Sequence, residues 1–436
     1  MKFELVNTKT EPTIGVKKDN KVLYLHSRYD PLKEAQRWAK QIILKSSTRK
    51  VIIVGMGAGY HIRALQKQYE NIDIEIWDFN ELYGQWLVES GLSKEANIKA
   101  FLPNYYVSEN IEKIKESFIS NINFQDTELL IYGPALHVIP KSLYKIKELL
   151  ETFKMNKSSI DRNKSLLEKN YHNNLQLQDR GISNWIDRFK DRDFVLVSSG
   201  PSLDKQLLTL KAISLKRDII IGSVGTALSS LANEDIKPHF AMISDPQDMV
   251  KEQLILQKQD FPLFYLSTAN HNAVRHFKGK RYIVWQKGFP EGEKRSEELK
   301  EPLIATGGSV ATCLLDLMVL MGAKRIALIG QDLAYTNNKS HSNLAYRKSD
   351  ITDHYDFKLV KNYYQNGQVR TSRSLFSYLQ WFENYISTLD KVEVWNCTEG
   401  GAYIKGCKHE ALRNFSNQKP FLTSHLSGED CELYKE

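Results

Sequence analysis

Features that would assign this chain to several well-known classes of protein are absent from its 436 residues. Its four cysteines, Cys313, Cys397, Cys407 and Cys431, show no metal-ligand spacing, so we expect reduced thiols. No apolar run approaches the roughly 18–20 residues of a membrane span. The opening MKFELVNTKTEPTIGV lacks the apolar core of a signal peptide. These absences predict a soluble cytoplasmic protein.

A concentrated run of basic residues is also absent, although the net charge is +8. Lys and Arg are spread along the chain, which is typical of a solvated lysine-rich surface. The alternative is a basic cleft for an anionic nucleotide or an acidic protein partner. We therefore expect no nucleic-acid partner.

Two catalytic signatures are missing as well. No glycine-rich loop carries the lysine of a Walker motif, which argues against a P-loop kinase. No Ser-His-Asp nucleophile elbow is found, and no repeat of fixed period.

Alternating strand and helix patterns predict an α/β protein with two Rossmann-like parallel-sheet domains joined by helices. The predicted parts are an N-terminal Rossmann-like domain, a helical linker, a central nucleotide-sugar domain and a mostly helical C-terminal extension. They cover residues 1–140, 141–192, 193–400 and 401–436, respectively. In the linker, we expect His172 and the paired asparagines beside it to be surface and capping groups.

The first glycine-rich turn, GMGAG at residues 55–59, follows a predicted buried strand at 51–54. With Asp78 closing the next strand, it resembles a methyltransferase or dinucleotide site, in which the acid binds ribose hydroxyls. The motif is common, and no catalytic loop of a known methyltransferase follows it. We favour a retained fold with a degenerate or accessory site over an active cofactor site.

Two further loops each precede a predicted helix, and the first of them also follows a predicted buried strand. In VSSGPSL, Gly200 permits a tight turn, Pro201 suits the first helical positions, and Ser202 offers a hydroxyl to a sugar or phosphate. In IATGGSV, Gly307 and Gly308 expose consecutive backbone N–H groups at a helix N-terminus, where the dipole favours an anion. Either loop could instead be only a turn and cap.

Polar residues also follow two other predicted strands, at the end of the sheet where ligands usually bind. Asp245 lies in SDP after FAMI, and Gln331 and Asp332 follow RIALI. Tyr335 and His341 come next, in a polar loop. Acids in these positions can simply cap the following helix, but together they predict one cleft.

As an ordered set, several of these segments resemble the motility accessory factor family of bacterial flagellin glycosyltransferases. The segments are SSGPSLDK (198–205), GSVGTAL (222–228), SDP (244–246), TGGSVATCLLDLMVLMGAKRIALIGQDLAYT (306–336) and NCTEGGAYIKG (396–406). The central domain is also similar to archaeal pterin diphosphokinase-like proteins, and its GPSL and TGG segments to bacterial surface-glycan sialyltransferases. The likeness covers about residues 190–410, and GMGAGYHI resembles the family's first domain.

The resemblance implies transfer of a nonulosonic acid, such as pseudaminic or legionaminic acid, from its CMP conjugate to Ser or Thr of flagellin in the bacterial flagellum. CMP-nonulosonic acid and flagellin would be the partners, with no cofactor and no metal; self-association stays open. The predicted donor-binding residues are Ser199, Gly200, Pro201, Ser202, Ser223, Asp245, Thr306, Gly307, Gly308, Ser309, Gln331 and Tyr335.

The catalytic base is predicted to be His341, with Asp332 or the donor's own carboxylate as alternatives. Sialyltransferases place a catalytic histidine just before the helix that would match residues 372–386. Here that stretch reads NYYQNGQVRT, and His354 lies further upstream. Alternative functions are an ATP-dependent pterin-type diphosphokinase, a flagellin-binding chaperone and, more distantly, a methyltransferase.

Overall fold

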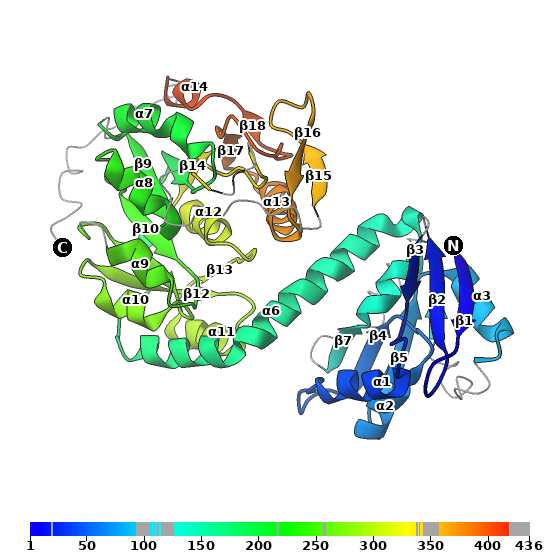
Figure 1. The fold of residues 1–436 in the computed structure, drawn as a ribbon. Helices are drawn as coiled ribbons and strands as arrows, with labels where there is room; N and C mark the ends of the chain where they lie inside the picture. Colours follow the sequence, from blue (N-terminus) through cyan, green and yellow to red (C-terminus); the bar gives the residue numbers. More distant parts are fainter. Residues whose placement is uncertain are drawn as a thin grey trace. The chain divides into compact units, whose positions relative to one another are not determined.

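The computed structural model describes residues 1–18, 21–92, 105–108, 110, 113–114, 126–215, 218–255, 259–336, 339, 341–342 and 357–417, with backbone alone at 105–107, 152 and 155–162. The chain divides into two compact units, Met1–Asp161 and Arg162–Glu436 (Figure 1). The division falls inside one helix, α6 (Tyr144–Leu175), which occupies much of the predicted helical linker. None of the helices in these ranges is long and apolar enough to cross a membrane.

The N-terminal unit contains the predicted parallel sheet, with strand order β6-β5-β4-β7. The strands are β4 (Lys50–Val54), β5 (Asp73–Asp78), β6 (Tyr105–Val107) and β7 (Thr127–Ile131). Its helices are α1 (Pro31–Lys40), α2 (Tyr60–Gln68) and α3 (Glu81–Glu89). The strand predicted at 51–54 and the next predicted strand, which ends at Asp78, are thereby confirmed.

A second, antiparallel sheet in this unit was not predicted. It comprises β1 (Lys2–Val6), β2 (Thr13–Lys18) and β3 (Lys21–Tyr24), in that order. Ile14 and Val16 of β2 join the same buried core as the central strand β4.

The larger unit is built on one nine-stranded sheet in which all neighbouring strands pair in parallel. In spatial order the strands are β13 (Leu303–Ile304), β12 (Arg281–Gln286), β11 (Leu263–Leu266), β10 (Phe240–Ile243), β9 (Ile219–Val224), β8 (Arg192–Val197), β14 (Ala323–Ile329), β17 (Glu393–Asn396) and β18 (Lys408–His409). The strands predicted directly before VSSGPSL, SDP and GQD are confirmed as β8, β10 and β14. The sheet continues past residue 400, because β18 pairs with β17.

The remaining elements of this unit cover the sheet or connect its strands (Figure 1). The helices are α7 (Leu203–Ser214), α8 (Leu228–Asn233), α9 (Val250–Ile255), α10 (His271–His276), α11 (Pro290–Leu299), α12 (Val310–Leu320), α13 (Arg373–Ile386) and α14 (Leu412–Asn417). A hairpin is formed by β15 (Lys358–Lys361) and β16 (Gln368–Thr371). The last 19 residues of the predicted C-terminal extension, 418–436, lie outside the described ranges.

Strand β8 marks the point where the strand order reverses. Strands β9 to β13 follow it in chain order on one side, while β14, β17 and β18 lie on the other. The central strands β8 and β9 are buried almost throughout, as expected for a parallel sheet covered on both faces. In open α/β sheets, ligands bind outside the carboxyl ends of the strands at such a reversal. The loops after β8 and β14 are therefore the place to look for a site.

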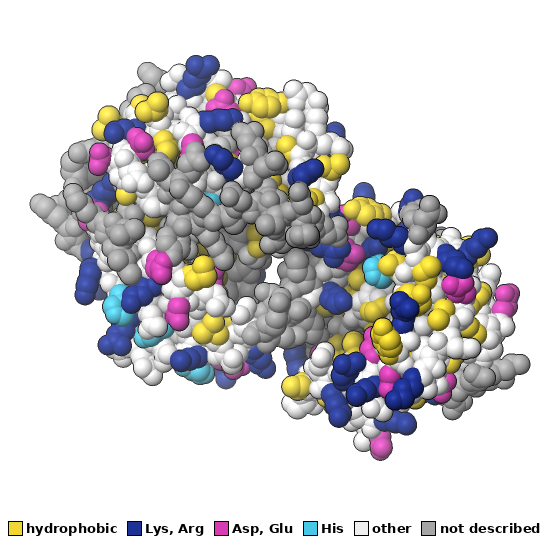
Figure 2. Space-filling view, in the orientation of Figure 1, with side chains coloured by type: hydrophobic (Ala, Val, Ile, Leu, Met, Phe, Trp, Pro, Cys, Tyr) yellow, Lys and Arg dark blue, Asp and Glu magenta, His cyan; other side chains and the backbone are white. Residues whose placement is uncertain are grey.

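Basic side chains are spread over the visible face of each unit rather than gathered in one run (Figure 2). This distribution agrees with the sequence, in which Lys and Arg are dispersed.

Candidate functional site

The loops after β8 and β14 bind each other directly. The backbone N–H of Gly200 donates to the carbonyl of Gly330 at 2.7 Å. The hydroxyl of Ser198 donates to Oε1 of Gln331 at 2.5 Å. The structure thus brings VSSGPSL and GQD together at the point where the strand order reverses.

Asp332 holds this arrangement from inside. Its carboxylate accepts hydrogen bonds from the Ser202 hydroxyl at 2.6 Å, from the Ser202 N–H at 3.2 Å and from the Thr336 hydroxyl at 2.6 Å. The side chain is only 2% exposed. Burial raises the pKa of Asp332 above its ordinary value, although the hydrogen bonds from Ser202 and Thr336 oppose that rise. These contacts give Asp332 a structural task in addition to any catalytic one.

Two positions at this junction have room only for glycine, because other atoms of the junction lie close to their Cα atoms. A Cβ on Gly200 would lie 2.2 Å from Oδ2 of Asp332 and 2.4 Å from the Gly330 carbonyl oxygen. A Cβ on Gly401, in the loop after β17, would lie 2.2 Å from the carbonyl oxygen of Asp332. The NCTEGG segment therefore closes over the same junction, because Ala402 N–H also donates to that carbonyl at 2.7 Å.

The candidate base His341 lies next to a residue that is bound to the VSSGPSL loop. Ser342 N–H donates to the Ser199 carbonyl at 2.9 Å, and the Ser342 and Ser230 hydroxyls are 3.0 Å apart. Ser342 is 1% exposed, whereas His341 is partly buried. The other histidine considered from sequence, His354, lies outside the described residues.

Two predicted binding residues occupy less accessible positions. Ser223 is fully buried in β9, and its hydroxyl donates to the carbonyl of Val224 at 3.0 Å. Tyr335 is partly buried beside the β15–β16 hairpin, with its N–H bound to the Arg370 carbonyl at 2.9 Å. Neither placement shows a side chain aimed at the junction of the β8 and β14 loops.

The IATGGSV loop lies against α13 rather than against the VSSGPSL loop. A Cβ on Gly307 would lie 2.4 Å from Cγ of Trp381, and one on Gly308 would lie 3.0 Å from Cε1 of Tyr378. Gly308 also has a φ of +89°, which side-chain-bearing residues rarely adopt. The adjacent glycines, which exceed what a helix cap needs, are explained by these two aromatic neighbours.

At the start of α12, some backbone N–H groups have partners within the chain and others do not. Gly307 N–H donates to the Thr312 hydroxyl at 2.9 Å, and Ala305 N–H to Oδ2 of Asp316 at 2.5 Å. Within the described parts of the chain, no acceptor is found for the N–H groups of Gly308 and Ser309. The Ser309 hydroxyl oxygen is buried there without a partner. Unused N–H groups at the first turn of a helix favour an anion.

Asp245 is exposed at the end of β10, where its carboxylate accepts from the Gln247 N–H at 2.9 Å. It is close enough to Tyr378 for its charge to help burial raise the pKa of that phenol. Asp245, Tyr378 and Gly308 therefore make a second group of candidate residues, near the carboxyl end of β10.

Two asparagines of α6 support this edge of the sheet, a role that the sequence did not reveal. Asn170 donates to the Pro246 carbonyl at 3.0 Å, and Asn174 to the Ser267 and Ala269 carbonyls at 3.1 and 2.8 Å. Asn174 is 1% exposed, so the expectation of a surface group is wrong for it, whereas His172 is exposed. Helical spacing of i, i+4 places both amides on one face, which is the signal that could have paired them.

In the N-terminal unit, the GMGAG loop is occupied by the chain's own side chains. His26 Nε2 accepts from the Ala58 N–H at 2.9 Å, and the Tyr83 hydroxyl donates to the Gly57 carbonyl at 2.9 Å. A Cβ on Gly57 would lie only 2.7 Å from Nε2 of His26, so the His26 ring fills the space beside this glycine.

The candidate ribose ligand Asp78 is likewise turned inward. Its carboxylate accepts from the Met56 and Phe79 N–H groups at 3.2 and 2.9 Å, and the residue is 2% exposed. Burial raises the pKa of Asp78 to about 6. This geometry supports a retained fold with a degenerate site.

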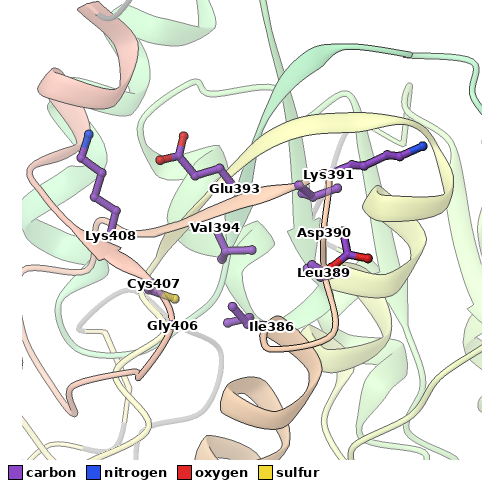
Figure 3. A pocket seen from close by; sticks show the side chains of 10 residues that line it. Ile386, Leu389, Asp390, Lys391, Glu393, Val394, Gly406, Cys407 and Lys408 are labelled. Carbon is purple, nitrogen blue, oxygen red and sulfur yellow. The ribbon is translucent and has the colours of Figure 1, made fainter.

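The larger unit also has an open cavity of about 510 Å³, away from all predicted site residues. It lies at the amino end of β17 (Figure 3), whereas VSSGPSL and GQD follow the carboxyl ends of β8 and β14. Ile386 and Val394 line its floor, and Lys391 and Lys408 extend outward from it. Among the described residues, no group of three or more His, Cys, Asp or Glu side chains is arranged to hold a metal ion.

The fold is that of an α/β protein whose strand order reverses at β8, the position where ligands usually bind in open parallel sheets. Residues 167–338 match the family model described as 6-hydroxymethylpterin diphosphokinase MptE-like. Among solved structures, a MAf glycosyltransferase from Magnetospirillum magneticum AMB-1 is similar over 96% of this chain and 71% of its own, with 14% identity and a TM-score of 0.51. No curated protein matches the chain by sequence. Together these matches support the resemblance predicted from the sequence: the chain is Maf-like in its fold, with an MptE-like central region.

Proposed function

We propose that the chain is a glycosyltransferase that transfers a nonulosonic acid of the pseudaminic or legionaminic type from its CMP conjugate to Ser or Thr hydroxyls of flagellin in the cytoplasm. The observation that carries the proposal is that the VSSGPSL and GQD loops hydrogen-bond to each other beside β8, where the strand order reverses. It lies in a fold that follows a MAf glycosyltransferase over 96% of the chain. Sites for nucleotides recur at this position in open parallel sheets.

The chemistry assigns a task to each loop. Ser199–Ser202 would hold the cytidine nucleotide, while the unused N–H groups of Gly308 and Ser309 and the unpaired Ser309 hydroxyl would bind the phosphate that departs with CMP. The bond between the anomeric carbon and the phosphate oxygen breaks through an oxocarbenium-like transition state. The acceptor oxygen forms the new bond, and His341 takes its proton. Donors supplied by the chain itself would let the reaction proceed without a metal.

Intact-mass analysis of flagellin tests the proposal. Flagellin is co-expressed with this protein and a pathway that makes a CMP-nonulosonic acid. We expect flagellin to gain the mass of one or more nonulosonic acid residues. Unmodified flagellin, in cells shown to contain the CMP-sugar, would contradict the proposal.

Substitution of Ser309 by Ala separates catalysis from binding alone. The structure leaves its hydroxyl buried and unpaired, so the fold loses little when it is removed. We expect the variant to bind flagellin and to glycosylate it more slowly. If the protein only binds flagellin as a chaperone, the substitution should leave its effect on flagellin unchanged.

A second candidate is an ATP-dependent diphosphokinase acting on a pterin-like alcohol, favoured by the family model that matches residues 167–338. In that reaction the β,γ-diphosphate of ATP would be transferred to the alcohol oxygen, and AMP would leave. Purified protein incubated with ATP, Mg²⁺ and 6-hydroxymethyl-dihydropterin decides between the two. AMP release that depends on the pterin would favour this candidate, and its absence would favour sugar transfer.

A further inference from the structure

Three aromatic residues of α13 lie on one face of the helix, at spacings of three and four. They are Tyr378, Trp381 and Tyr385, all partly buried. Trp381 and Tyr385 stack with ring centroids 4.7 Å apart, and Trp381 occupies the space beside Gly307. This face is therefore the wall against which the IATGGSV loop packs.

The two tyrosines of this face differ in their hydrogen bonding. The Tyr385 hydroxyl donates to Oδ1 of Asp316, whose other oxygen accepts from the Ala305 N–H. For the Tyr378 hydroxyl, no partner is found among the described residues. Tyr385 thus fixes the loop to the helix, while Tyr378 has a hydroxyl to spare.

Two polar groups lie near the Tyr378 side chain. Its ring lies against Gly308, whose N–H group is unused. Asp245 is also near, because its negative charge adds to the burial that raises the pKa of the phenol. A group that donates to Asp245 and accepts from Tyr378 would satisfy both, which describes a sugar hydroxyl better than an anion.

We infer that Tyr378 is a donor-binding residue whose hydroxyl, together with the carboxylate of Asp245, binds one hydroxyl group of the sugar nucleotide beside Gly308. The inference rests on the proposed function, because it takes the CMP-sugar as the ligand. It adds a residue from α13, outside the loops that follow the sheet strands.

Steady-state release of CMP from the CMP-nonulosonic acid tests the inference on the full chain, with flagellin as acceptor. Tyr378→Phe removes only the hydroxyl, so we expect the donor KM to rise about 3–10-fold, the loss of one neutral hydrogen bond. We expect kcat to change by less than about twofold and thermal stability to stay near that of the wild type, since no protein contact is lost. A Tyr378→Phe protein with the wild-type KM would overturn the inference.

Tyr385→Phe is the matched control on the same helix face. Its hydroxyl is bound to Asp316, so we expect a lower melting temperature with little change in the donor KM. Asp245→Asn alone should raise the donor KM. In the double variant Tyr378→Phe with Asp245→Asn, the change in binding free energy should be smaller than the sum of the two single changes. Fully additive effects would show that the two side chains do not share a ligand group.

The same assay separates this inference from the function on which it rests. Wild-type protein that releases no CMP from the sugar nucleotide would overturn the proposed function and the inference with it. Wild-type protein that releases CMP, with a Tyr378→Phe variant of equal KM and equal stability, would overturn the inference alone.

Discussion

The backbone N–H of Ser342 donates to the carbonyl oxygen of Ser199 at 2.9 Å, joining a loop far along the chain to the loop that follows β8. Because His341 is the preceding residue, this bond holds the candidate base next to the loop assigned to the nucleotide. The contact involves only backbone atoms, so the identities of the two serines do not reveal it. It is the structural reason to retain His341 over Asp332 as the base.

Replacement of His341 by Gln tests this assignment. A general base contributes about 10²–10⁴-fold to a rate, so we expect kcat for flagellin glycosylation to fall by about 10²-fold or more, with the donor KM little changed. The exposed His172→Gln is the control and should behave as wild type. A His341→Gln protein with wild-type kcat would transfer the role to Asp332 or to the donor's carboxylate.

Substitution of Gly200 by Ala should disrupt the junction of the β8 and β14 loops. The new Cβ would meet Oδ2 of Asp332 at 2.2 Å and the Gly330 carbonyl at 2.4 Å. We expect a loss of about 1–3 kcal/mol in the free energy of unfolding, the usual effect of overpacking, together with loss of transfer activity. Urea denaturation measures the first effect. Gly367→Ala is the matched control, because its Cβ would meet only Nδ2 of Asn362, at 3.3 Å; an equal loss there would refute the explanation.

The GMGAG loop should not bind S-adenosylmethionine. His26 already accepts from the Ala58 N–H, and Asp78 is committed to the Met56 and Phe79 N–H groups. Isothermal calorimetry should therefore show no heat of binding for this compound, whereas CMP injected into the same protein should give a saturable signal. Saturable heat with S-adenosylmethionine would restore the loop as an active cofactor site.

The N-terminal unit should lose stability as the pH falls below 6.5. Burial lowers the pKa of His26 and, more strongly, that of His61 from their ordinary value of 6.5. The unfolded chain therefore binds these protons first, so the stabilisation is complete above pH 6.5 and declines below it. Asp78 acts in the opposite direction, since its pKa is raised to about 6 and the folded state binds that proton first.

Glutamine at position 26 keeps a side-chain acceptor for Ala58 but does not titrate. In the His26→Gln protein we expect a smaller loss of stability between pH 7.5 and about pH 5, because one of the two destabilising histidine contributions is removed. Hydrogen exchange of peptides within residues 1–92, corrected for the intrinsic rate at each pH, measures it. An unchanged pH dependence would mean that His26 does not carry the effect.

Buried strands and glycine loops were the parts of the fold that the sequence could predict. The apolar runs at 194–197 and 219–221 are uninterrupted, which is the pattern of central parallel strands, and they form most of β8 and half of β9. Strands β1 and β3 are short and largely exposed, so their sequences carry little hydrophobic signal. Their antiparallel pairing was consequently missed.

For the site, sequence reasoning found loops but not their neighbours. The order of strands in the sheet decides that VSSGPSL meets GQD, and no local pattern encodes that order. Asn170 and Asn174 lie in a polar helix, where an amide that reaches a distant carbonyl looks the same as one in solvent. Tyr378 was missed for the same reason, because its contact with Gly308 joins two segments that are far apart in the sequence.

The packing of Trp381 and Tyr378 into the spaces beside Gly307 and Gly308 places two segments of the chain under one steric constraint. A relative that replaces either glycine with a larger residue must also shrink or move the aromatic residue opposite it, so the two positions should vary together. Recognition of distant homologues would gain from treating the glycine pair and the α13 aromatics as one discontinuous signature. A chain that keeps the glycines without their aromatic partners would have preserved the motif for a different reason.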